Sequence, residues 1–404
     1  MNKRKIFNDP IYGLITLPSE LVFDLIEHPY FQRLRRITQL GLTHYVYPGA
    51  LHTRFHHAIG AMHLTTKSID VLRSKGVEIT EAEAEAVTVA VLLHDIGHGP
   101  FSHALEHTLL NVHHETLTVA FMETLNTEFD GRLTTAIDIF CDKHPKTFLH
   151  QLVSGQLDMD RMDYLNRDSY FTGVHEGVIG YDRIILMLNV VNNCLVVEEK
   201  GIFSIEKFLI ARRLMYWQVY LHKTVVSAEQ MLIHALLRAK EIKDEACAAP
   251  ISPALRTLLN LGTDFDFDTF GKSNLLAVFA ELDDTDIISA LKAWQTSNDT
   301  VLAILSKGLI QRKLFKVQMN ANIIENKMLN DKRKRFENEL FLSQKAAKHL
   351  IIQVTEANKV YDKTHDEICI LYKDNSVLPM SQSIDYELST RKTAKHFLCY
   401  YQHI

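Results

Sequence analysis

The feature that most constrains this chain is an apolar helical run that ends in a His-Asp pair. Residues 87–93 read VTVAVLL, and His94 and Asp95 follow directly, before two glycines and a proline. Neighbouring residues on a helix point about 100° apart and do not normally share a partner. The glycines let the backbone bend where the helix ends, so both side chains can face one metal ion there. A helix cap with a structural His–Asp hydrogen bond explains the pair alone equally well.

Histidine is unusually frequent around this pair. The chain has 21 histidines, and 11 of them lie between His44 and His114. Surface use of histidine would spread these residues evenly. Their crowding indicates a site that needs imidazoles as ligands, proton carriers or phosphate contacts.

Two further motifs lie on either side of the His-Asp pair. Before it, Arg54 precedes His57 by three residues, which places a bidentate anion contact beside a candidate ligand. After it, residues 158–168 read DMDRMDYLNRD, and Asp160 and Tyr164 are at helical spacing. One helix face can therefore offer carboxylate, phenol and guanidinium groups. Taken alone, this segment is more typical of a salt-bridged helix face.

The composition restricts the class of protein. A length of 404 residues with 47% hydrophobic and 23% charged residues is typical of a soluble globular protein with a large core. The five cysteines lie far apart without a CxxC pair, which fits a reducing cytoplasm. No secretory signal or membrane-spanning run is present, so we expect a cytoplasmic protein without membrane association. The net charge of −5 gives no indication of nucleic-acid binding.

Periodicity predicts a mainly α fold with two regions. We expect a helical catalytic domain over residues 1–242 and a smaller α+β C-terminal region over 243–404 that packs on it, divided at the polar, proline-containing stretch 243–253. A small β-hairpin is expected from residues 194–198 and 202–205. The expected helices cover residues 19–40, 55–74, 81–96, 115–128, 206–242, 268–281, 285–296 and 333–351, and further strands are expected at 313–318 and 366–373.

The three motifs, in this order, match the pattern H…HD…D of the HD superfamily of phosphohydrolases. Residues 3–240 resemble its deoxynucleoside triphosphate triphosphohydrolase branch, including the human-type catalytic domains that follow a sterile-alpha-motif domain. The stretches that carry the resemblance are residues 8–13 (NDPIYG), 31–35 (FQRLR), 39–41 (QLG), 47–50 (YPGA), 94–103 (HDIGHGPFSH), 114–115 (HE) and 222–223 (HK). The resemblance implies an HD-domain helical bundle.

The resemblance also implies the ligands of one divalent metal ion. The matching residues are His57, His94, Asp95 and Asp160. Two imidazoles and two carboxylates suit Mn, Fe, Zn, Ni or Mg, and they leave positions open for water and a phosphate oxygen. Such an ion acts as a Lewis acid and activates water.

Further residues match the family's catalytic and substrate-binding groups. His98, His103 and His114 match the histidines around the triphosphate, with His103 as proton donor and Glu106 as its acidic partner. Gln39 and Leu40 match residues that hold the sugar, and Tyr220 matches one that excludes a 2′-hydroxyl. Phosphate contacts are implied at Arg54, Arg161, Tyr164, Arg212 and Lys223. The implied products are a deoxynucleoside and inorganic triphosphate.

The family resemblance also suggests partners. We expect a homo-oligomer, a dimer or tetramer, and an allosteric nucleotide site at the positions Lys5, Asn8, Gln32 and Arg35. Glu27 stands at the position of the Asp that reads guanine in that site. We therefore expect the site to read another base or to be absent. Two alternative functions remain open: an HD phosphohydrolase for a monophosphate, cyclic or alarmone nucleotide, and a nucleotide- or nucleic-acid-binding regulator with a vestigial site.

Overall fold

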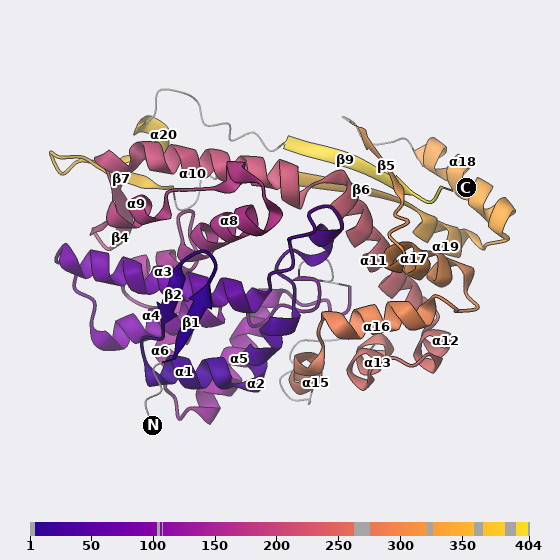
Figure 1. The fold of residues 1–404 in the computed structure, drawn as a ribbon, viewed down its shortest axis with the longest axis horizontal. Helices are drawn as coiled ribbons and strands as arrows, with labels where there is room; N and C mark the ends of the chain where they lie inside the picture. The colour runs from indigo at the N-terminus through magenta and orange to yellow at the C-terminus, as the bar shows by residue number, and fades with distance from the viewer. Residues whose placement is uncertain are drawn as a thin grey trace.

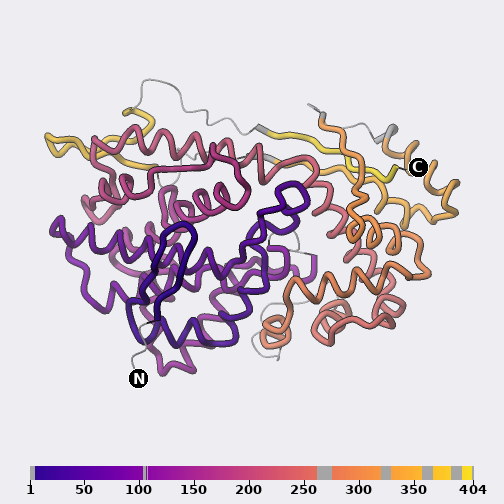
Figure 2. Tube along the Cα trace, viewed as in Figure 1, coloured from indigo at the N-terminus to yellow at the C-terminus, as the bar shows by residue number. Residues whose placement is uncertain are grey.

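The computed structural model describes residues 5–102, 106, 108–261, 275–320, 326–358, 367–383 and 393–402. Helices dominate, and the strands form small sheets, which confirms the predicted mainly α class. Figures 1 and 2 show the N-terminal half, in indigo to magenta, beside the C-terminal helices in orange. Strand β7 (Cys369–Leu371), in yellow, runs back to the N-terminal half in Figure 1.

Three packed helices form the centre of the N-terminal half: α3 (Arg54–Ser74), α4 (Glu81–Leu93) and α8 (Met159–Thr172). A capping box between Thr80 and Glu83 starts α4. From residue 86 to its end, every residue of α4 is buried, as its continuous apolar run requires. The helix α5 (His114–Glu128) covers the end of this group, and the other helices here are α6 (Thr134–Phe140), α7 (Thr147–Val153) and α9 (Tyr181–Leu186).

The prediction of a single helix over residues 19–40 is wrong. The chain forms α1 (Glu20–Glu27), α2 (Pro29–Gln32) and a 3-10 turn η1 (Arg33–Arg36), followed by a second 3-10 turn η2 (Gly41–Tyr45). His28 has an extended backbone between α1 and α2, as the residue before a proline prefers. The chain therefore bends around the core instead of continuing straight.

The expected hairpin exists with a different partner strand. Strand β4 (Cys194–Glu198) pairs antiparallel with β3 (Leu188–Val191), whereas residues 202–205 begin helix α10 (Ile202–Met215). The two strands are joined by Asn192 and Asn193, both with positive φ. A second hairpin lies at the N-terminus, formed by β1 (Ile6–Asp9) and β2 (Gly13–Thr16).

The long helix expected over residues 206–242 is interrupted. After α10, one π-helical turn spans Tyr216–Tyr220, and α11 (Lys223–Glu241) then begins with the His222 side chain as its N-cap. A π-turn shifts the side chains of the following residues relative to a regular helix. Here the interruption directs Tyr216 and Tyr220 into the large cavity described below.

The C-terminal region mixes helices with strands, as predicted, and its strands belong to two sheets. Strand β9 (Thr393–Tyr400) is the central strand between β5 (Lys316–Asn320) and β6 (Ile351–Asn358). In the other sheet, β7 (Cys369–Leu371) pairs parallel with β4 of the N-terminal half and antiparallel with β8 (Val377–Pro379). The helices are α12 (Lys243–Ala248), α13 (Pro253–Asn260), α15 (Leu275–Glu281), α16 (Asp284–Trp294), α17 (Thr300–Ile310), α18 (Asn326–Leu340), α19 (Gln344–Ala347) and α20 (Met380–Ser383).

The expected domain boundary is partly helical, since α12 follows α11 almost directly. The division at this point stays a prediction. The predicted helix at 268–281 is described only from residue 275 onward.

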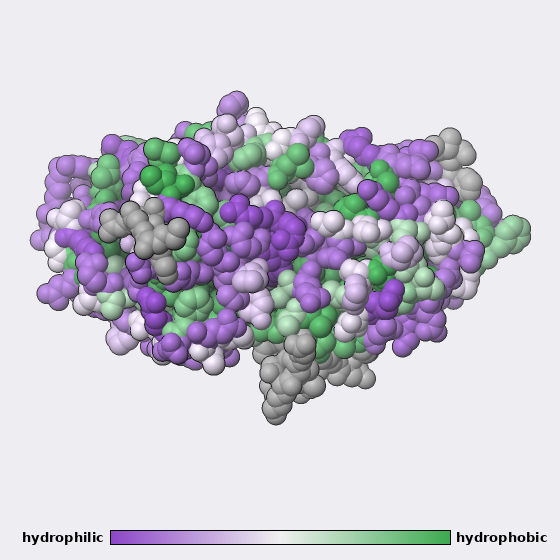
Figure 3. Space-filling model, turned by 60° about the horizontal axis from the view of Figure 1, so that its bottom comes forward, coloured by the Kyte–Doolittle hydropathy of each residue, from purple (hydrophilic) through white to green (hydrophobic). Residues whose placement is uncertain are grey.

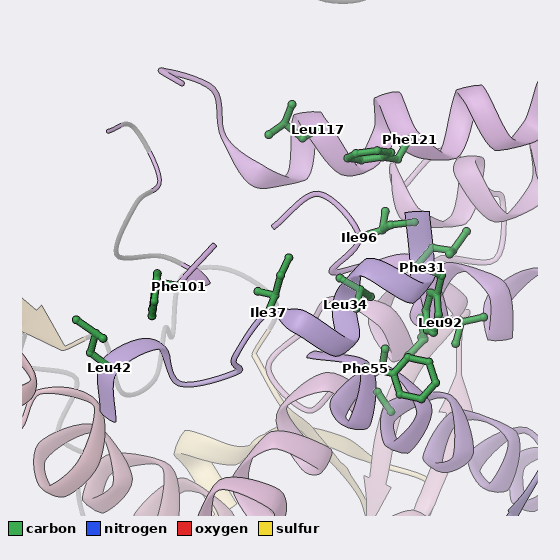
Figure 4. Close-up of a cluster of buried hydrophobic side chains, with 14 of the residues drawn as sticks. Phe31, Leu34, Ile37, Leu42, Phe55, Leu92, Ile96, Phe101, Leu117 and Phe121 are labelled. Atoms are coloured by element: carbon green, nitrogen blue, oxygen red, sulfur yellow. The ribbon is translucent and has the colours of Figure 1, made fainter. Parts of the chain in front are cut away.

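Apolar side chains from several elements form one core beside the functional residues. Figure 4 shows part of it, where side chains of α2 and η1 meet those of α3, α4 and α5. On the face in Figure 3, hydrophilic residues dominate and hydrophobic ones form small separate groups. Within the described part of the chain, no helix has the length and apolar character needed to cross a membrane.

Candidate metal centre and active-site cavity

The four predicted metal ligands meet at the junction of three helices. His57 lies in the first turn of α3, His94 and Asp95 directly follow α4, and Asp160 lies in the first turn of α8. The Nε2 atom of His57 is 3.3 Å from the Nε2 atom of His94 and 3.1 Å from Oδ1 of Asp160. Asp95 places a carboxylate oxygen 3.6 Å from His57 Nε2 and another 3.4 Å from His94 Nε2.

The hydrogen bonds of the two imidazoles determine which nitrogen faces the cluster. His57 donates from Nδ1 to Asp163 at 2.7 Å, and His94 donates from Nδ1 to the carbonyl oxygen of Val91 at 2.5 Å. In the neutral form of each imidazole, the Nε2 atom therefore carries a lone pair. Two lone pairs and a carboxylate oxygen that point at one another repel, unless a cation lies between them. The donor set thus fits a divalent metal ion.

The electrostatics of the cluster also fit a cation. Burial acts to lower the pKa of His57, but hydrogen bonds to Asp160 and Asp163 outweigh it and raise the pKa to about 10. Burial opposes ionisation of Asp160, yet the imidazoles of His57 and His94 hold its pKa below the usual range. Without an ion, the site therefore attracts protons, and a divalent cation would take their place.

A buried ion network holds His57 in its orientation. Asp163 accepts hydrogen bonds from Nε of Arg167 at 2.8 Å and from Nη2 at 2.9 Å, and Arg167 also donates to Asp9 at 2.8 Å. Asp163 and Arg167 are fully buried. A Cβ atom added at Gly60 of α3 would lie 2.0 Å from Asp163 Oδ1, so the close contact between α3 and α8 requires glycine there.

Arg54, which was predicted to contact phosphate, also has a structural role. Its guanidinium pairs with Asp95, and its Nε donates to the Ser102 hydroxyl at 2.8 Å. Ser102 in turn donates to the carbonyl oxygen of Thr38 at 2.9 Å. Both Phe101 and Ser102 have positive φ, 53° and 55°, so this loop holds a strained backbone beside the cluster.

The predicted catalytic histidines border the same centre. His98 places Nε2 3.3 Å from Asp95, and its ring stacks on that of His114 with centroids 4.0 Å apart. Glu106 accepts hydrogen bonds from the backbone N–H of His114 at 3.0 Å and from its Nδ1 at 2.7 Å. Glu106 thus orients His114. His103, the predicted proton donor, lies outside the described residues.

A cavity of about 770 Å³ opens onto the cluster. Its wall includes His94, Asp95 and Asp160, and it extends to residues of α11 and β6. Of the other residues predicted from the sequence, those that line it are Gln39, Leu40, Arg54, His98, His114, Tyr164 and Tyr220. The structure thus brings most of the predicted metal, catalytic and sugar-binding residues to one cavity.

Three predicted phosphate contacts do not line this cavity. Arg161 pairs with Asp158, the N-cap of α8, and Arg212 is buried in α10 near Tyr164. The Nε atom of Arg212 has no hydrogen-bond partner among the described residues. Lys223 is exposed at the start of α11. Their roles stay predictions.

Sequence reasoning missed Asp168 as a site residue. Asp168 is buried in the cavity wall, where it accepts hydrogen bonds from the Tyr220 hydroxyl at 2.7 Å and from His52 at 2.8 Å. The i, i+4, i+8 spacing of Asp160, Tyr164 and Asp168 was the available signal, because such residues share one helix face. Asp163 and Arg167 occupy the neighbouring, buried face.

The positions expected to form an allosteric site lie apart from this cavity. Lys5 pairs with Glu27 at 2.7 Å, and Arg35 donates to Gln32 at 2.8 Å. Asn8 lies in β1.

Comparisons with known proteins agree with this geometry. The profile of the HD domain matches residues 54–168, and that of an HD associated region matches 179–252. A phosphohydrolase from Bacteroides thetaiotaomicron VPI-5482, known from a crystal structure, superposes with a TM-score of 0.94 at 47% identity and covers 99% of this chain and 100% of its own.

Two relatives extend the comparison. The uncharacterized protein YwfO of Bacillus subtilis (strain 168) is 32% identical over 330 residues, which are 80% of this chain and 74% of YwfO. The deoxynucleoside triphosphate triphosphohydrolase SAMHD1 homolog of Dictyostelium discoideum is 34% identical over 257 residues, 59% of this chain and 50% of that protein. The chain belongs to the HD-domain phosphohydrolase family.

Proposed function

We propose that the chain hydrolyses deoxynucleoside triphosphates to a deoxynucleoside and inorganic triphosphate. The observation that carries the proposal is the shared cavity. His94, Asp95 and Asp160 line this cavity together with the Asp168–Tyr220 pair and Gln39, the residues suited to a sugar. A nucleotide can therefore place its phosphates at the cluster while polar groups hold its sugar. The Dictyostelium relative, which carries this activity in its name, supports the proposal.

The ligands of the ion would be His57, His94, Asp95 and Asp160. A divalent ion bound there supplies charge neutralisation for the phosphates and activates water. The chain's own residues orient the reacting groups: Asp163 holds His57, and Arg54 holds Asp95. Glu106 keeps the Nδ1 proton on His114 and orients the ring.

The chemical step is an attack of water on the α-phosphorus. The bond between this phosphorus and O5′ of the deoxyribose breaks, and the leaving oxygen takes up a proton. A histidine suits this proton transfer near neutral pH, and we assign it to His103, with His98 and His114 beside it. The stacked rings of His98 and His114 line the same cavity, where they would contact the triphosphate.

Tyr220 would select deoxyribose. Its hydroxyl is fixed on Asp168, so the ring cannot move away from the cavity without breaking that bond. A 2′-hydroxyl on the substrate would meet this ring.

A product panel tests the function. Metal-analysed protein is incubated separately with each dNTP, each rNTP and each dNMP, and the phosphate products are separated by anion exchange. The proposal predicts inorganic triphosphate from dNTPs and little from rNTPs. Release of orthophosphate or pyrophosphate alone would show a different HD phosphohydrolase. A complete absence of hydrolysis with bound metal would favour the regulator alternative.

A further inference from the structure

The part of the cavity beside Gly41 is acidic. Glu229 on α11 and Glu356 on β6 both line it, next to Gln230. Glu229 lies against the backbone of Gly41, because a Cβ atom added there would be 3.7 Å from its Oε1 atom. Gly41 directly follows Gln39 and Leu40 in the sequence and has φ +50°. The carboxylate of Glu229 therefore lies beside the segment that carries Gln39 and Leu40.

Glu229 has no partner within the described part of the chain. No described residue donates a hydrogen bond to its carboxylate, and no described cation pairs with it. Burial, followed by the neighbouring charge of Glu356, raises its pKa to about 8. Glu229 is half-buried, and a poorly solvated carboxyl group without donors is costly in a folded protein. A ligand that brings N–H donors would remove that cost.

The position of Glu229 indicates which part of a nucleotide it meets. Under the proposed function, on which this inference rests, the triphosphate lies at the metal donors and the sugar lies between Gln39 and Tyr220. The group left to reach the wall beyond Leu40 is the nucleobase. We infer that Glu229 is a specificity-determining residue that binds the Watson–Crick edge of the substrate's base and favours guanine.

The chemistry of the base edges supports guanine. An ionised carboxylate accepts hydrogen bonds at two oxygens, and guanine presents two adjacent donors, N1–H and N2–H. Adenine, cytosine and thymine each place an acceptor beside their donor, so one carboxylate oxygen would face a lone pair. Two N–H donors stabilise the ionised form of Glu229, and guanine binding is therefore coupled to loss of its proton. Glu356, from the C-terminal region, lines the same cavity.

The test compares bases in the wild type, Glu229→Gln and a control. A glutamine has one acceptor and one donor, so it no longer matches guanine. The control is Glu115→Gln, which removes a carboxylate from another part of the cavity wall, beside His114. For each protein, kcat/KM is measured with dGTP, dATP, dCTP and dTTP, and Kd for dGTP and dATP is measured with chelator present, so that no turnover occurs. Thermal unfolding verifies that each variant is folded.

The inference predicts that the wild type prefers dGTP over dATP at least about tenfold and that Glu229→Gln lowers this ratio about tenfold. Glu115→Gln should keep the wild-type ratio. Equal hydrolysis of all four dNTPs by the wild type, or an unchanged ratio in Glu229→Gln, would overturn the inference and leave the proposed function intact. Failure to release triphosphate from any dNTP would refute the proposed function instead.

Discussion

Asp163 offers a sharp test of how the metal centre is built, because it touches only one of the ligands. Its carboxylate accepts from His57 Nδ1 at 2.7 Å and from Arg167 at 2.8 and 2.9 Å, and it is fully buried. In Asp163→Asn, one oxygen becomes an NH2 group that faces a donor. Among the residues that the structure describes, Arg167 then keeps only Asp9 as an ionic partner.

Two effects of Asp163→Asn follow, and both have a defined size. Loss of one partner from a buried ion network lowers the free energy of unfolding by about 3 kcal/mol. Loss of the carboxylate that fixes the ligand His57 weakens metal binding about 10- to 100-fold. The first is measured by urea unfolding of metal-free protein, and the second by competition for Mn²⁺ with a fluorescent chelator.

A matched control separates stability from metal binding. Arg238 is held in a partly buried network with Asp299 at 2.7 Å and Glu241 at 2.9 Å, away from the cluster. Arg238→Gln should therefore lower the free energy of unfolding and leave the Mn²⁺ affinity unchanged. If folded Asp163→Asn binds Mn²⁺ as tightly as the wild type, Asp163 does not orient His57 for the ion.

Four further predictions concern the same regions. Gly97→Ala places a Cβ atom 2.3 Å from the carbonyl oxygen of His114, so overpacking should lower the free energy of unfolding by about 1–3 kcal/mol. A urea titration measures this loss, and an unchanged unfolding midpoint would contradict the close contact. Excess Mn²⁺ at 100 times its Kd should stabilise the wild type by about 2.7 kcal/mol, and Asp160→Asn should lose most of this gain in thermal unfolding. The pKa of Glu229 in the folded protein is raised to about 8, so the protonated side chain contributes its full stability below pH 4.5, and this contribution declines as the pH rises to about 8. Glu229→Gln lacks this decline, so its melting temperature minus that of the wild type should grow between pH 4.5 and pH 8. A constant difference would refute this prediction. Tyr220→Phe removes the bond to Asp168, and the ratio of kcat/KM for dGTP over GTP should fall; an unchanged ratio would show that the hydroxyl does not fix the ring.

The meeting of the candidate metal ligands could be predicted because the resemblance gave their order and their local signals agree with it. Each lies at a helix end, and the sequence marks these ends: the glycines after Asp95 and the acidic N-cap Asp158 before Asp160. The structure brings His57, His94 and Asp160 within reach of one ion. The assignment of an actual ion to them stays a prediction.

The errors in the fold have identifiable causes. The run at residues 202–205 is short and β-branched at both ends, so it looked like a strand, but tertiary packing makes it the start of α10. The better hairpin signal was the pair Asn192-Asn193, whose positive φ angles suit the two-residue turn between β3 and β4. The π-turn at Tyr216–Tyr220 leaves no trace in apolar periodicity.

The acidic wall formed by Glu229 and Glu356 could not be predicted from the sequence. The two residues are distant in the chain and lie on a helix and a strand of different regions. Their juxtaposition depends on how β6 packs beside α11, which neither periodicity nor a motif reports. Long-range placement of this kind needs coordinates.

The most direct test of the central claim follows the oxygen of the attacking water. Wild-type protein with bound metal is allowed to hydrolyse dGTP in H₂¹⁸O, and the products are analysed by mass spectrometry. Attack at the α-phosphorus with cleavage of its bond to O5′ predicts one ¹⁸O atom in inorganic triphosphate and none in deoxyguanosine. Label in orthophosphate or pyrophosphate, with no labelled triphosphate, would contradict the proposed reaction.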